Sequence, residues 1–312
     1  NSDFSRTDMS HATIVESNLS RGRFNGANLE SVDFTDSRLS MAVFFEANFK
    51  NANLNRAQVK GAKLAGGTFE NTSLPRADIT GADLTDAKFL NSNLSRAKLN
   101  GAILRRTNLK RSDLSEADLS IADLTGASMI EVKLIGANME RIKLNQAKLP
   151  GAQLCGAKIN KAKLVQVDLS KADLSGANLT GADLTESNLQ DCDLSRANLT
   201  EAILQKANLK STFLIGANLQ KADLTEVNLE EANIAGTKLG KANCQKANMK
   251  KVDLQRSDLE QADFSQADLT GANLTGSKLG DAYFKNANLT GADLSLADTT
   301  DTDFSNAKGY NS

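Results

Sequence analysis

Few residues of this 312-residue chain have the types and spacing that catalysis or metal binding requires. His11 is the only histidine and no cysteine lies near it, so a His/Cys metal site or a Ser-His-Asp triad has no natural candidate. Asp191 and Asp193 resemble the paired carboxylates of acid–base catalysis, yet most Asp residues simply fill one polar position of a repeat. No glycine-rich phosphate-binding motif is present. These residues predict a protein that is not an enzyme and holds no metal and no cofactor.

The three cysteines show no CxxC spacing. Their odd number argues against a disulfide framework and fits a reducing compartment. Cys192 and Cys244 fall at positions that we expect to be interior, where they would serve as small apolar residues. Cys155 falls at an outward position.

The composition is nearly neutral, with 37 Lys and Arg, 38 Asp and Glu, and a net charge of −1. This balance predicts no nucleic-acid partner. No apolar run approaches 18 residues, so we expect no membrane span in this segment, and no signal peptide is visible. The chain begins at Asn1, already inside the repeat. The localisation stays open between the cytoplasm and a membrane reached through a flanking anchored region.

The residues that could act chemically are positioned by a five-residue repeat, which segment 168–189, "DLSKADLSGANLTGADLTESNL", shows clearly. A large apolar residue, here called the centre, recurs at every residue number ending in 4 or 9. From Phe4 to Phe304 there are 61 centres, and only Thr299 is plainly polar. No insertion or deletion interrupts this register, so one architecture is expected throughout.

The period of five fits a short extended segment followed by a corner. Two residues before each centre lies a small residue, usually Ala, and in extended backbone these two side chains point to the same side. The remaining three positions hold the Asp, Asn, Ser and Gly that turns favour. Successive corners would wind the chain into stacked coils with the apolar residues inside.

The phenylalanines indicate how many sides each coil has. Nine of them lie at centres in three runs with a spacing of 20, which is four repeats, so each run would form an interior stack in a four-sided coil. These predicted interior residues are Phe4, Phe24 and Phe44, then Phe49, Phe69 and Phe89, then Phe264, Phe284 and Phe304.

The pattern closely resembles the pentapeptide repeat family, whose motif is A(D/N)LXX. The resemblance covers nearly the whole chain and implies an all-β fold, a right-handed quadrilateral β-helix. The repeats would form a single continuous rod of about 15 coils, from residues 1 to 308, followed by a tail at 309–312. The resemblance also suggests a cyanobacterial protein.

Candidate contact residues are those that depart from the repeat on its outward positions. Met41, Val43 and Phe45 form the best apolar cluster, while Ile103, Phe213, Ile215 and Tyr283 are further outward apolar residues. Residues 96–165 carry 13 basic and 6 acidic residues, and residues 166–235 carry 5 and 11. The basic candidates are an arginine ladder at Arg56, Arg76 and Arg96, a cluster at Arg105, Arg106, Lys110 and Arg111, and lysines at 133, 143, 148, 158 and 163. The plain alternative is a solvated surface with ion pairs between coils.

The favoured function is a non-catalytic scaffold that binds protein partners. The resemblance implies such a role in cyanobacterial differentiation or in envelope assembly involving heterocyst glycolipids. The alternative is a DNA mimic that binds gyrase, as in the quinolone-resistance members of the family, although those members are strongly acidic. Because a β-helix that ends without a cap exposes strand edges, end-to-end self-association is a further expectation.

Overall fold

The structure is a computed structural model in which residues 2–310 are described. It contains two compact units, Asn1–Lys158 and Ile159–Ser312. The described residues form no helix, and their β-structure consists of single bridge residues at numbers ending in 3 or 8. Each extended segment is therefore too short to count as a strand, and the fold is regular because the same short segment recurs every five residues.

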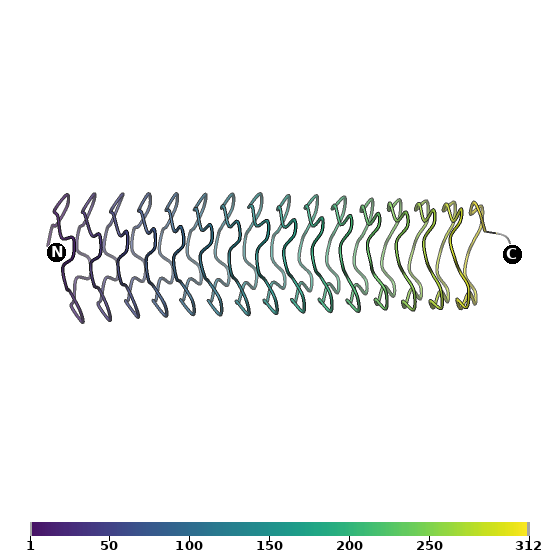
Figure 1. Ribbon diagram of the computed structural model, residues 1–312, viewed down its shortest axis with the longest axis horizontal. Coiled ribbons are helices and arrows are strands. Elements are labelled where there is room, and N and C mark those ends of the chain that lie inside the picture. The colour runs from purple at the N-terminus through teal and green to yellow at the C-terminus, as the bar shows by residue number, and fades with distance from the viewer. Residues whose placement is uncertain (1, 311–312) are drawn as a thin grey trace. The chain divides into compact units, whose positions relative to one another are not determined.

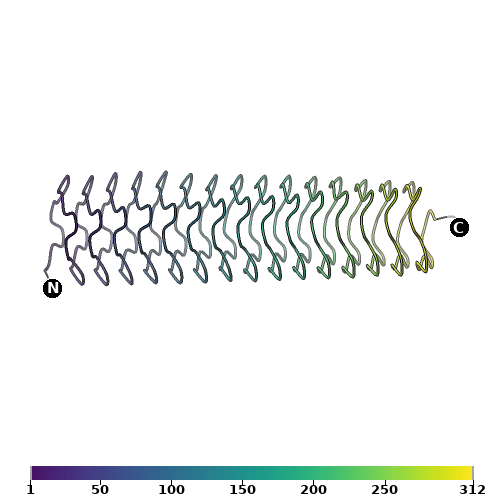
Figure 2. The same ribbon diagram turned by 90° about the horizontal axis from the view of Figure 1, so that it is seen from below.

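Within each unit the bridges are parallel and join residues 20 apart. In the first unit they extend from Asp3↔Arg23 to Asn138↔Lys158, and in the second from Lys163↔Asp183 to Asn288↔Lys308. One turn of the chain thus takes 20 residues and passes four bridge ladders. The repeated coils of each unit are visible along the colour ramp in Figure 1 and again in the perpendicular view of Figure 2. This is a β-helix-type repeat fold.

The repeat satisfies its backbone donors in a fixed order, which the five residues 197–201 illustrate. One N–H closes the turn within the chain, one bonds to the preceding coil, and two bond to the following coil. The fourth residue of the five has no backbone acceptor. The donor–acceptor distances are 3.0 Å for Ala197 to Leu194, 2.9 Å for Asn198 to Ala177, 2.7 Å for Leu199 to Asn218 and 3.0 Å for Glu201 to Gln220.

The Asp or Asn before each centre supplies the missing acceptor. Its Oδ1 accepts the N–H of the residue after the centre, as Asn198 does from Thr200 at 3.1 Å. This bond explains why the position prefers Asp and Asn over other polar residues. Pro75 and Pro150 each follow a centre, and the residues before those two centres are Ser73 and Lys148 rather than Asp or Asn. Because proline has no N–H, no acceptor is needed at these two turns.

Each corner is a turn with one residue in the left-handed region. Every residue numbered with a final 1 or 6, from Arg6 to Asn306, has a φ between +52° and +71°. The residue before it never does, so the corners have the dihedral pattern of type II turns. Proline is favoured at the second residue of this turn type, which is where Pro75 and Pro150 lie.

The interior holds the centres and the small residues two positions before them. Successive rings in the three phenylalanine runs are stacked with centroids 4.4 to 5.3 Å apart. Seven of the nine rings are at most 1% exposed. Phe4 and Phe304 are half-buried, since each lies in a terminal coil of the described residues.

Two interior features were not apparent from the sequence. The Tyr310 ring stacks on Phe304 at 3.8 Å and thereby covers one face of the third phenylalanine stack. Where Ser, Thr or Cys replaces the small Ala, most side chains donate to a backbone carbonyl, either in the preceding coil or, as Thr107 does to Leu104, in their own turn. Ser92 Oγ donates to the Phe69 carbonyl, and Cys192 Sγ donates to the Leu169 carbonyl at 2.7 Å. Most polar atoms at these interior positions are thus satisfied, and Ser187 Oγ is the exception, with no partner among residues 2–310.

Candidate interaction surface

The corner residues form vertical ladders because equivalent positions recur every 20 residues. Their left-handed backbone directs the side chains to solvent, next to the equivalent side chains of the adjacent coils. Ion pairs at this spacing include Arg56–Asp36 and Arg106–Asp86 in the first unit and Lys206–Glu226 in the second. Some of the charged residues that lie far apart in the sequence are therefore paired between coils.

The ladder Arg56, Arg76 and Arg96 lies between two carboxylates on the same corner. Arg56 Nε and Nη2 donate to the two oxygens of Asp36 at 2.7 and 2.5 Å. At the other end, Arg96 Nε and Nη2 donate to Glu116 at 2.9 and 3.1 Å. Arg76 is exposed, and no carboxylate among residues 2–310 forms an ion pair with it. Two arginines of the predicted ladder thus form ion pairs and the third, Arg76, does not.

A shallow groove of about 350 Å³ follows this ladder. Arg56, Arg76 and Arg96 line it together with Pro75 and Glu116. Because Pro75 presents no polar side chain beside Arg76, the middle of the groove offers an apolar wall and one unpaired cation.

The second basic cluster is largely neutralised by carboxylates of adjacent coils. Arg105 pairs with Asp123 at 2.7 Å, Arg106 with Asp86 at 2.6 Å, and Arg111 with Glu131 at 2.7 Å. Lys110 is half-buried and attracts Glu131 from a longer distance. The sequence predicts these four residues as a basic contact surface. The coil geometry places three of them in ion pairs between coils, and their contact with a partner stays a prediction.

The pKa values of the carboxylates report this pairing. Hydrogen bonds from Arg56, Arg96 and Arg106 hold the pKa values of Asp36, Glu116 and Asp86 below their usual values. These groups are exposed, so the shifts identify partners rather than large stabilising energies.

Asp123 differs because it is the only buried charged residue among residues 2–310. Burial opposes ionisation of its carboxyl, but bonds from Thr125 and Arg105 outweigh that penalty and lower its pKa.

The apolar cluster Met41, Val43 and Phe45 lies on one side of a single coil. Met41 is 60% exposed, Phe45 is 44% exposed, and Val43 is half-buried between them. A Cβ added to Gly61 would lie 2.6 Å from Met41 Sδ, so Gly61 leaves the space into which this thioether packs. The bridge ladder places Arg23 and Lys63 on either side of Val43. The result is an apolar centre with cations at its rim.

Seven lysines of the first unit replace the usual Asp or Asn, and the four predicted as contact residues occupy one bridge ladder each. Lys133, Lys143, Lys148 and Lys158 are all exposed, and none has an ion pair within the described part of the chain. Lys163 holds the equivalent position at the start of the second unit.

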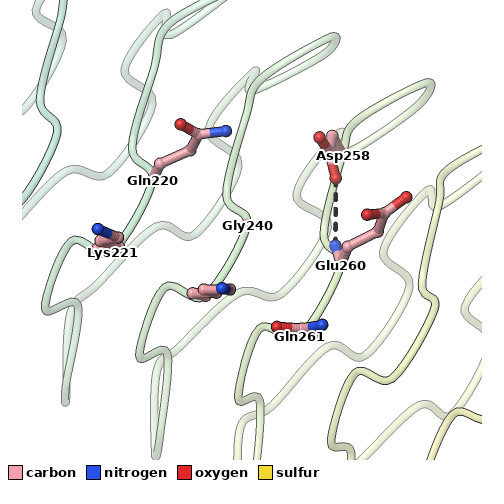
Figure 3. Close-up of a pocket in the computed structure, with 7 residues that line it drawn as sticks. Gln220, Lys221, Gly240, Asp258, Glu260 and Gln261 are labelled. Carbon is pink, nitrogen blue, oxygen red and sulfur yellow. Dashed lines mark hydrogen bonds between the residues drawn. The ribbon is translucent and has the colours of Figure 1, made fainter.

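A second depression in the second unit was not found by the sequence reasoning. It measures about 360 Å³ and is lined by residues that include Lys221, Gly240, Asp258 and Glu260 (Figure 3). It exists because Gly240 has no side chain between Gln220 and Glu260, and a glycine immediately after a centre is the signal that would have located it. Its lining carries both signs of charge, so it selects no ligand class.

The remaining candidate residues lie apart. Among residues 2–310 no group of His, Cys, Asp and Glu is arranged to hold a metal ion. Cys155 is exposed, whereas burial raises the pKa of the Cys192 thiol to about 12 and also raises that of Cys244. Asp193 accepts the Ser195 N–H at 2.8 Å and so belongs to a turn rather than to a carboxylate pair. The described residues include no helix that could span a membrane.

The outward aliphatic and aromatic residues are exposed as the register predicted. Ile103 is 38% exposed, Ile215 46%, and Phe213 and Tyr283 50% each. Ile121 at 57% was missed, although its corner position in the register could have identified it.

Solved structures of pentapeptide repeat proteins are similar to this chain. HetL, involved in heterocyst differentiation regulation in the cyanobacterium Nostoc sp. strain PCC 7120, is 28% identical, with 78% of this chain and 92% of HetL covered and a TM-score of 0.43. Trypsin-treated QnrB1, a plasmid-mediated fluoroquinolone resistance protein, is 19% identical, with 58% and 91% covered and a TM-score of 0.29. A pentapeptide repeat protein of the Arabidopsis thaliana thylakoid lumen is 30% identical, with 36% and 66% covered and a TM-score of 0.24. No curated protein matches significantly.

Because all these TM-scores are below 0.5, the assignment rests on the repeats themselves. The family model described as pentapeptide repeats matches successive and partly overlapping segments from residue 14 to residue 306. The matched segments are 14–51, 52–91, 92–129, 122–160, 137–176, 157–191, 177–214, 192–230, 228–266 and 267–306. The chain belongs to the pentapeptide repeat family.

Proposed function

We propose that this chain is a non-catalytic scaffold that binds protein partners through the outward residues of its coils. The observation that carries the proposal is the cluster Met41, Val43 and Phe45 with cations at its rim. Exposed Met and aromatic side chains surrounded by polar residues are typical of the energetic centres of protein interfaces.

The absence of enzymatic activity is part of the same proposal. It is supported by the hydrogen bonds of the polar side chains: Asp and Asn accept turn N–H groups, and most interior Ser, Thr and Cys side chains donate to backbone carbonyls. Side chains committed in this way to the backbone are poor acids, bases or nucleophiles.

The finer architecture is also proposed. We infer one right-handed, four-sided repeat domain over residues 1–308 in a single continuous rod of about 15 coils, with a tail at 309–312. The context that we propose is cyanobacterial differentiation or envelope assembly, as the family resemblance suggests. A membrane-anchored flanking region and end-to-end self-association belong to this proposal as well.

Photo-crosslinking tests the scaffold function. A benzoylphenylalanine placed at Phe45 should give a discrete protein adduct in cells that naturally produce the chain. The matched control is the same substitution at Thr185, which occupies the equivalent register position in the second unit. Loss of the Phe45 adduct in a Met41→Gln background would support the apolar cluster as the contact.

Equal adducts at both sites, or none at Phe45, would contradict the scaffold proposal. The gyrase-binding alternative predicts a gyrase adduct and inhibition of supercoiling at stoichiometric protein. Charge disfavours it for the first unit, where 21 Lys and Arg against 17 Asp and Glu give a net charge of +4. A DNA mimic instead needs the dense negative charge of a polyphosphate.

A further inference from the structure

The three arginines of the groove differ in what their side chains contact. Arg56 is bound to Asp36 in the preceding coil, and Arg96 is bound to Glu116 in the following coil. Both guanidinium groups use Nε and Nη2 in two parallel bonds, the geometry in which arginine holds a carboxylate most firmly. The outer two arginines therefore point away from the one between them.

Arg76 is left as the unpaired cation at the centre of this corner. Its neighbours in the ladder are both cationic, and coils are about 4.8 Å apart at each bridge ladder. Like charges in such adjacent positions repel, and Glu116, which is already bound to Arg96, attracts Arg76 only from a longer distance. A carboxylate arriving at Arg76 would relieve this repulsion.

The groove is suited to receive that carboxylate. It has a volume of about 350 Å³, and Pro75 forms an apolar wall beside Arg76. The N–H donors of a free guanidinium form a planar fork that can hold a carboxylate through two parallel hydrogen bonds.

We propose that the Arg76 groove is a subsite that binds a Glu or Asp side chain from an acidic segment of a partner protein. This inference rests on the proposed scaffold function and deepens it by naming the chemistry of one contact. Asp36 and Glu116 limit the basic stretch to three coils, so the longer phosphate backbone of a nucleic acid would meet carboxylates at both ends. The groove also has no aromatic side chain on which a base could stack.

Peptide binding tests the subsite. The probes are a rhodamine-labelled Gly-Glu-Gly-Glu-Gly amide and its Gln counterpart, measured by fluorescence anisotropy at about 20 mM salt, where screening is weak. The wild-type chain should prefer the Glu peptide, and Arg76→Gln should weaken that binding about three- to fivefold, as expected for one exposed ion pair. Arg196→Gln is the matched control, because Arg196 has the equivalent corner register between Gly176 and Gly216.

A second variant separates binding from folding. Arg76→Glu should abolish the preference for the Glu peptide and raise Tm, because it replaces repulsion between like charges in adjacent coils by attraction to Arg56 and Arg96. Equal peptide affinity of wild type and Arg76→Gln, an equal loss in Arg196→Gln, or no preference for the Glu peptide would overturn the subsite. If the peptide test fails but the Phe45 adduct forms, the scaffold function stands without the subsite. If the peptide test succeeds but the Phe45 adduct is missing, the scaffold proposal fails.

Discussion

At the scale of the residue, one hydrogen bond accounts for the most characteristic polar position of the repeat. The N–H after each centre has no backbone acceptor, and the Asp or Asn before the centre supplies one. Lysine at this position cannot accept a hydrogen bond. In the turn that contains Lys133, the Ile135 N–H has no acceptor within residues 2–310. Lysine at this position therefore costs local stability wherever the residue after the centre has an N–H, as at Lys133 but not at Lys148.

Lys133→Asn should therefore stabilise the chain by about 0.5–1.5 kcal/mol, the usual contribution of one hydrogen bond. Urea denaturation measures the gain, and amide hydrogen exchange at Ile135 should become slower. Lys148→Asn is the matched control, because residue 150 is proline and has no N–H to satisfy. A similar gain in both variants would show that removal of positive charge, rather than the new bond, is responsible.

At the scale of the element, the coil is stabilised by side chains that repeat at a spacing of 20. In the first unit Phe69 lies between Phe49 and Phe89, with ring centroids 4.7 and 4.4 Å away. Because no coil covers both faces of its own interior, each ring depends on the coils on either side. The stacks therefore contribute packing that a single coil cannot provide.

Phe69→Ala should lower the free energy of unfolding by about 3–5 kcal/mol, since it removes a fully buried ring and leaves a cavity. Thermal melting and chemical denaturation measure the loss. Phe304→Ala should cost clearly less, because that ring is only half-buried. Equal losses in the two variants would contradict the argument from burial.

At the scale of the whole molecule, the net charge of −1 conceals two units of opposite sign. Residues 1–158 have a net charge of +4, and residues 159–312, with 16 basic and 21 acidic residues, have −5. Both units also contain partly buried Asp residues in the turn position with lowered pKa values. Burial raises these pKa values, but hydrogen bonds from Thr125 and Arg105 to Asp123, and from Thr225 and Gln205 to Asp223, outweigh it.

A lowered pKa in the folded state adds stability above the pKa of the unfolded chain, and this stability is lost as pH falls through the folded value. The free energy of unfolding should thus stay nearly constant between about pH 6 and pH 8. It should decrease once the pH is lowered below about 4. Asp123→Asn should reduce the acid-induced fall, because the amide still accepts the Thr125 N–H and does not titrate. Stability that increased on acidification from about pH 5 to pH 3 would contradict this assignment.

Much of the fold followed from the sequence because its period leaves little freedom. An unbroken register from Phe4 to Phe304 determines which side chains share the interior, and a phenylalanine spacing of 20 predicts the offset seen in every bridge. The candidate surface was less predictable. Exposure of Met41 and Phe45 followed from their register, but the partners of the arginines depend on which of two adjacent coils each side chain approaches.

The sequence by itself determined the family, the period of the coil and the division between interior and exterior positions, because these depend only on residue type and spacing. The tertiary structure alone decided that Arg56, Arg96, Arg105, Arg106 and Arg111 are paired and that Arg76 is not. It also decided that the Asp and Asn side chains face the turn N–H groups rather than only solvent. The physical reason is that a long side chain can reach charged residues in either adjacent coil, about 20 residues away along the chain. Sequence spacing alone does not show which of these ion pairs forms.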